Sequence, residues 1–202
     1  MNHEAKKAGN YEILQEIRLG GRVMLLGYDA TSKDAPYMTC YQHYNLIGER
    51  TFPAAVAGKD YLEILTVFLE RVQEQQQLAQ QFRAHRPVPL EILGPQHCRP
   101  GMETESLENQ LVILAPTSLA PEYRTADCQL GYAISGFGCT PKARGQAVYV
   151  EELYSGDVSR WDRSDILGLA DLNRLPDWAK GKIQAREQER NQPKKNKGGQ
   201  ER

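Results

Sequence analysis

Hydrophobic and polar residues alternate along the first quarter of the chain in the manner of β-strands. Residues 11–17, 22–28 and 37–44 are rich in β-formers and predict three strands, and residues 46–53 are a candidate for a short fourth. The Gly-Gly pair at residues 20–21 supplies the turn between the first two strands. The pattern therefore predicts a small N-terminal β-meander.

After residue 60, the spacing of apolar residues changes from that of a strand to that of a helix. Asp60 is a candidate N-cap, with Glu63 three residues later as in a capping box. The predicted apolar face consists of Tyr61, Leu65, Phe68 and Val72, widened by Leu62, Ile64 and Leu69. The glutamine-rich stretch over residues 73–81 continues the pattern to about residue 84. We interpret it as a solvated helical face, with a partner-binding stretch as the alternative.

Three prolines between residues 86 and 95 end the helical pattern and indicate a domain boundary. Beyond them, strands are predicted over residues 110–115, 128–135, 146–154 and 165–171. A helix is predicted to start at residues 175–178, with Pro176 in its first turn, and to fray beyond residue 183.

The expected fold class is α+β, built from two small units. An N-terminal β-meander plus amphipathic helix covers residues 10–85, and a mainly antiparallel β unit closed by a short helix covers residues 88–183. Residues 1–9 are expected to be disordered, and the basic tail over residues 184–202 is expected to be disordered or frayed helix.

Composition narrows the function classes. The 202 residues carry a net charge of -1, which excludes a strongly acidic DNA mimic and a protein that coats nucleic acid through bulk charge. A local basic patch remains compatible with this balance. Neither an apolar run of roughly 18 residues nor an apolar signal core is present, so we expect a cytoplasmic protein with no membrane partner.

No catalytic, cofactor or metal motif is recognisable. Cys40 with His43, and His97 with Cys98, raise the question of zinc, but two converging ligand pairs are missing, and buried, reduced thiols are the favoured interpretation. We therefore expect no enzyme activity, no cofactor and no metal. A thiol or metal enzyme that uses Cys139 or Cys98 is the minor alternative.

The segment over residues 129–178 concentrates unusual chemistry. Gly136, Phe137 and Gly138 lack the spacing of a phosphate-binding loop. They predict a strand bulge or hairpin corner with glycines at positive φ on either side of an inward-packed Phe137. A role for the corner in contacting a ligand is the alternative.

Lys142, Arg144, Arg160, Trp161 and Arg163 form the candidate binding set for a partner protein or nucleic acid. Guanidinium groups stacked on Trp161 would present donors to phosphate or carboxylate groups. Alternatively, Arg160 and Arg163 pair with nearby aspartates and hold a turn together.

The stretch DCQLGYAISGFGCTPKARGQAVYVEELYSGDVSRWDRSDILGL, followed by LPDWAK, resembles an uncharacterised domain of accessory proteins of integrative and conjugative elements. The N-terminal stretch YEILQEIRLGGRVMLLGYD resembles a second small module of accessory and large polyvalent proteins of such elements. The resemblance covers most of residues 10–183 and transfers no catalytic residue. It implies a cargo protein of mobile elements, for which anti-CRISPR or antirestriction activity is the expectation.

Two functional hypotheses follow. The first is a non-enzymatic anti-defence protein that binds a host nuclease complex. The second is a nucleic-acid-binding accessory module for transfer or regulation of the element, based on the candidate binding set and the basic tail.

Overall fold

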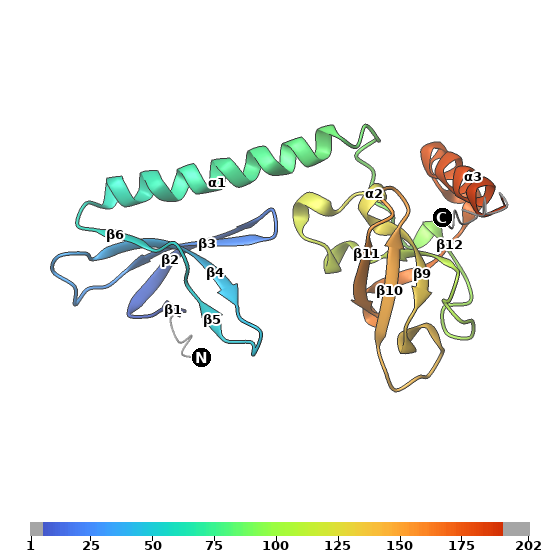
Figure 1. The fold of residues 1–202 in the computed structure, drawn as a ribbon, viewed down its shortest axis with the longest axis horizontal. Helices are drawn as coiled ribbons and strands as arrows, with labels where there is room; N and C mark the ends of the chain where they lie inside the picture. Colours follow the sequence, from blue (N-terminus) through green and yellow to red (C-terminus); the bar gives the residue numbers. More distant parts are fainter. Residues whose placement is uncertain (1–5, 192–202) are drawn as a thin grey trace, which may run out of the picture. The chain divides into compact units, whose positions relative to one another are not determined.

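The computed structural model describes residues 6–191 and consists of two compact units, which meet in the sequence between Pro87 and Val88 (Figure 1). The predicted α+β class is confirmed. The first unit combines an antiparallel sheet with one long helix, and the second combines an antiparallel six-stranded sheet with a short C-terminal helix.

The first unit is an antiparallel meander, in which β1 to β5 follow one another in order and β6 also pairs with β4. Its strands are β1 (Lys7–Ala8), β2 (Tyr11–Leu19), β3 (Arg22–Tyr28), β4 (Tyr37–Tyr44), β5 (Arg50–Thr51) and β6 (Val56–Gly58). The three predicted strands are confirmed, whereas the candidate over residues 46–53 is reduced to the two residues of β5.

The N-terminus departs from the expected disorder over residues 1–9. Residues 7 and 8 form β1, because Ala8 is buried and pairs with Tyr11 of β2. Residues 1–5 lie outside the described part of the chain.

Helix α1 (Tyr61–Ala84) begins as predicted, since the Asp60 side chain accepts a hydrogen bond from the Leu62 N–H at 2.7 Å. Its buried face is narrower than predicted. Ile64 and Phe68 are buried, but Leu62 and Leu69 are 67% and 53% exposed.

The glutamine-rich stretch of α1 is solvated as predicted, with one exception. Gln75 is buried and lies against Gly20 in the β2–β3 turn, where an added Cβ would be 3.0 Å from its amide oxygen. The other five glutamines of the stretch are exposed. Gln75 therefore joins the far part of the helix to the sheet.

Alternation along β3 gives the first unit an apolar cluster on each face of its sheet. Met24 and Leu26 pack with Ile64 and Phe68 of α1. Leu25 points to the opposite face, where it joins a second cluster with Ala8, Met38 and Cys40.

The sheet of the second unit has the strand order β11-β10-β9-β8-β12-β7, and all its neighbours are antiparallel. Its strands are β7 (Cys98–Arg99), β8 (Leu111–Leu114), β9 (Leu130–Ser135), β10 (Ala147–Glu152), β11 (Val158–Asp162) and β12 (Ile166–Ala170). The sequence did not predict β11, which forms one edge of the sheet. A one-turn helix, α2 (Ala126–Gln129), replaces the start of the strand expected over residues 128–135.

Helix α3 (Asp177–Asn191) closes the apolar core, with Ala179 and Ile183 among the buried residues that pack with Leu111 and Leu130 of the sheet. It extends to Asn191, so residues 184–191 are helical where disorder or a frayed helix was expected. Arg186 explains the extension, because it pairs with Glu151 of β10 and lies 4.0 Å from the centre of the Tyr132 ring. Residues 192–202 lie outside the described chain.

Gln129 crosses the core of the second unit and is fully buried. Its amide oxygen accepts from the Leu93 N–H at 2.8 Å, and its amide nitrogen donates to the carbonyls of Leu93 at 3.0 Å and Leu114 at 2.9 Å. One side chain thereby satisfies the backbone of two segments that would otherwise bury unpaired polar groups.

We predict that Gln129→Leu lowers the free energy of unfolding by about 3 kcal/mol, because three buried backbone groups lose their partners. Both tryptophans of the chain, Trp161 and Trp178, lie in the second unit, so urea unfolding followed by tryptophan fluorescence reports on this unit. Gln146→Leu, at an exposed position of the same unit, is the control and should change the free energy of unfolding by less than about 0.5 kcal/mol. Equal stability of the two variants would contradict the bridging role.

Candidate partner-binding surface

The corner between β9 and β10 requires its two glycines for different reasons. Gly136 has φ of +119°, and a Cβ there would lie 2.2 Å from the Ala147 carbonyl oxygen. Gly138 does not have positive φ, contrary to the prediction, but a Cβ there would lie 2.2 Å from the Gln146 carbonyl oxygen. The backbone of the corner is therefore pressed directly against the start of β10.

Phe137 points outward, and the prediction that it packs inward is wrong. Its side chain is 80% exposed. The space beneath the corner is occupied by the close contacts of the two flanking glycines with β10, and a single 3₁₀ turn over Phe137–Cys139 directs the ring away from them. The corner thus presents an aromatic side chain to solvent.

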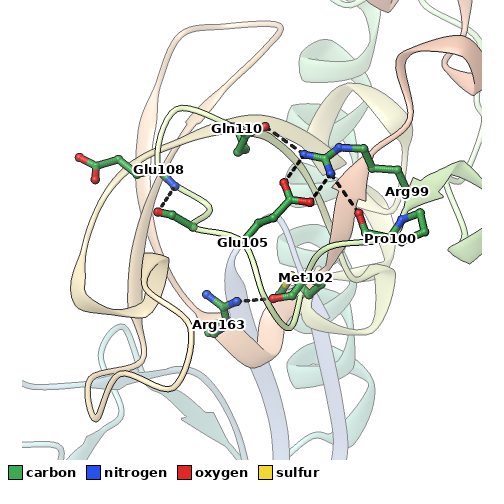
Figure 2. A network of polar contacts seen from close by, with 8 residues as sticks. Arg99, Pro100, Met102, Glu105, Glu108, Gln110 and Arg163 are labelled. Carbon is green, nitrogen blue, oxygen red and sulfur yellow. Dashed lines mark hydrogen bonds and ion pairs between the residues drawn. The ribbon is translucent and has the colours of Figure 1, made fainter.

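The side chain of Arg163 holds this corner in place through hydrogen bonds to the backbone. Its guanidinium donates to the carbonyls of Gly138 and Cys139, the latter at 3.2 Å. It also donates to the Met102 carbonyl, as Figure 2 shows. Its backbone N–H donates to the Gln146 carbonyl at 2.8 Å. The donors of Arg163 are thus directed at the protein's own backbone.

A second arginine closes the neighbouring loop. Arg99 donates to both carboxylate oxygens of Glu105 at 2.9 Å, to the Gln110 side chain at 3.2 Å and to the Pro100 carbonyl at 3.0 Å (Figure 2). The hydrogen bonds from Arg99 hold the pKa of Glu105 below its usual value. Sequence reasoning missed this network, because residues six and eleven positions apart in a loop carry no pattern that predicts contact.

The closed loop and the corner are joined through the backbone. The Leu107 N–H donates to the Cys139 carbonyl at 2.9 Å, and Leu107 is fully buried. Met102, from the same loop, is the third acceptor of Arg163. The loop before β8 therefore supports the corner.

The predicted stacking of guanidinium groups on Trp161 is not formed. Arg160 pairs across the sheet with Tyr149, and Trp161 pairs with Val148, so the two side chains lie on opposite faces of β11. Arg160 forms an ion pair with Asp162 at 3.0 Å, and the Trp161 indole N–H donates to the Ser159 hydroxyl at 2.7 Å. Their local contacts agree with the turn-holding alternative more closely than with a shared guanidinium surface.

Lys142 and Arg144 differ from the arginines above. Both are exposed, and within residues 6–191 neither has a hydrogen-bond or ion-pair partner for its side chain. They lie in the same β9–β10 connection as Phe137. We call Phe137, Lys142 and Arg144 the corner surface.

Burial disfavours the thiolate form of Cys40, Cys98 and Cys139. Burial raises the pKa of the Cys40 thiol to about 11, against the opposing effect of Arg71, and burial also raises the pKa values of the Cys98 and Cys139 thiols. An activated cysteine needs the opposite shift. The imidazole of His97, a candidate base, lies with its Nδ1 3.0 Å from the Gly94 N–H.

No group of three or more His, Cys, Asp or Glu residues within residues 6–191 is arranged to hold a metal ion. Cys40 and His43 lie three positions apart on β4, which places them on opposite faces of the strand.

Comparisons with protein-family models, with curated proteins and with solved structures found no significant match. Over residues 6–191, none of the helices combines the length and apolar character needed to cross a bilayer.

We predict that Arg163→Ala lowers the free energy of unfolding of the second unit by about 2–4 kcal/mol, because three backbone carbonyls lose a charged donor. Arg160→Ala is the matched control and should cost less than about 0.5 kcal/mol, since its ion pair is exposed. Urea unfolding followed by tryptophan fluorescence measures both. If Arg163→Ala lowers the free energy of unfolding no more than Arg160→Ala does, the corner does not depend on the guanidinium of Arg163.

The Cys40 thiol predicts a pH dependence of the first unit. An unfolded thiol ionises near pH 9.0, whereas Cys40 in the fold ionises near pH 11, so its contribution to stability is present below pH 9 and is lost between pH 9 and pH 11. Urea midpoints from far-UV circular dichroism should therefore fall more steeply over this range in wild type than in Cys40→Ser. Parallel curves would refute the shifted pKa.

Proposed function

We propose that this protein is a non-enzymatic accessory protein of a mobile genetic element that acts in anti-defence, as an anti-CRISPR or antirestriction protein, by binding a host nuclease complex through the corner surface. The resemblance to accessory proteins of conjugative elements supports the context. The observation that carries the binding role is the 80% exposure of Phe137 on a corner fixed by two glycines and Arg163.

A fixed, exposed aromatic is well suited to protein recognition. Binding energy at interfaces is concentrated in a few aromatic and arginine side chains that enter pockets on the partner. Because the corner is held before the partner arrives, little conformational entropy remains to be lost there on binding. Arg144 and Lys142 would add contacts with acidic groups around the pocket.

The alternative is a nucleic-acid-binding accessory module for transfer or regulation of the element. Lys142 and Arg144 favour it, because their side chains have no ion-pair partner in the described part of the chain and such groups can neutralise phosphates. Phe137 would then stack on an unpaired base. The net charge of -1 limits this mode to a local patch.

We predict that Phe137→Ala and Arg144→Ala each weaken protection of a plasmid or phage in cells that carry CRISPR or restriction nucleases. Loss of an interface hot spot of about 2 kcal/mol corresponds to a loss of affinity of roughly 30-fold. Leu172→Ala is the control, because Leu172 is an exposed apolar residue elsewhere in the second unit and should be neutral.

Three outcomes separate the hypotheses. Protection that is lost with Phe137→Ala and kept with Leu172→Ala supports the proposal. Salt-sensitive binding of DNA or RNA that weakens with Arg144→Ala, without any effect on nuclease interference, supports the alternative. Equal interference with and without the wild-type protein, across several nuclease types, refutes the anti-defence role.

A further inference from the structure

We propose that the first unit contains an anion-binding site for phosphate groups, formed by Arg22 of β3 and Arg71 of α1, which both contact the ring of Tyr41 of β4. The guanidinium carbons of Arg22 and Arg71 lie 5.2 Å and 5.1 Å from the centre of the Tyr41 ring. Three elements far apart in the sequence therefore bring two cations to one aromatic ring. This site is independent of the corner surface.

The two positive charges lack compensation from the protein. Within residues 6–191, neither guanidinium is paired with a carboxylate, and Glu74, one helical turn from Arg71, is not paired with it either. The distances to the shared ring place the two guanidinium carbons no more than about 10 Å apart. A bound anion would be attracted by both positive charges.

Arg71 is held in position for this role. One guanidinium nitrogen donates to the hydroxyl of the fully buried Thr39 at 3.4 Å, and the other donates to the Ala54 carbonyl at 2.6 Å. Ala54 has φ of +54°, a left-handed conformation that is uncommon for alanine. The strained segment around Ala54 is therefore tied to the same guanidinium that faces Tyr41.

Arg71 has a structural role through its hydrogen bonds, whereas the Arg22 side chain is exposed. Within residues 6–191 that side chain makes no hydrogen bond or ion pair, and it lies over the same ring as Arg71. By contrast, Arg18 on the adjacent strand is compensated by Glu16, at 2.7 Å. Paired guanidinium groups suit tetrahedral oxyanions, since their planar N–H groups match phosphate oxygens.

The phosphate group has two candidate sources, a free small anion and the backbone of a nucleic acid. Because guanidinium groups lie over Tyr41, recognition is expected to involve the phosphate more than base stacking. The two sources are distinguished by the size of the probe.

Two titrations of the full-length protein at low salt test the proposal. Binding of inorganic phosphate is monitored through the NMR chemical shifts of the Arg22, Tyr41 and Arg71 amides. Binding of a labelled thymidine oligonucleotide is monitored through fluorescence anisotropy. We expect saturable binding of phosphate in wild type that weakens about tenfold or more in Arg22→Gln and remains unchanged in Arg18→Gln. Arg22→Gln removes only the side-chain contact with the Tyr41 ring and keeps the backbone pairing of Arg22 with Leu19, so the fold is expected to persist and the test stays interpretable.

Tighter, salt-sensitive binding of the oligonucleotide with the same dependence on Arg22 identifies a nucleic-acid backbone as the source, whereas binding of phosphate alone identifies a small anion. Absence of binding to either probe, or equal binding by wild type and Arg22→Gln, would overturn the proposal. The corner surface is unchanged in these variants, so failure here leaves the anti-defence proposal untouched.

Discussion

The corner of the second unit depends on one side chain, the guanidinium of Arg163. It bonds the carbonyls of Gly138 and Cys139 in the corner and of Met102 in the loop before β8. Carbonyls in a half-buried turn need a donor, and a charged, planar donor can serve several at once. The outward direction of Phe137 follows from this arrangement, because the backbone beneath it is fixed in contact with β10.

Both units use arginine in the same way at loops that the sheets do not hold. Arg71 bonds the Ala54 carbonyl in the first unit, and Arg99 closes the loop before β8 in the second. What distinguishes Arg71 is a second cation, Arg22, at the same ring. The Arg22 side chain differs from the side chains of Arg71, Arg99 and Arg163, because within residues 6–191 it makes no hydrogen bond or ion pair.

Sequence patterns predicted the elements that depend on residues close together in the sequence. Alternation defined β2, β3 and β4, and the Asp60 cap defined the start of α1. The edge strand β11 was missed because the charged sequence over residues 159–163 resembles a solvated turn, and only its pairing with β10 makes it a strand. Once it is a strand, Arg160 and Trp161 must face opposite sides, and the predicted cluster cannot form.

The position of the glycine corner between two strands was predictable, but the directions of its side chains were not. Gly136 marked a corner, since its positive φ is a local property. The exposure of Phe137 and the inward role of Arg163 depend on contacts with residues 102 and 146, which no local pattern reveals. Gln129 and the Arg22–Tyr41–Arg71 cluster are likewise tertiary features.

The central claim is that the exposed corner is rigid before any partner binds, and backbone ¹⁵N relaxation of the free protein tests it most directly. The account predicts order parameters near about 0.85 for the amides of Phe137, Gly138 and Cys139, as in the neighbouring strands. Values below about 0.6 at these amides would show a mobile corner and contradict a binding surface fixed by Arg163.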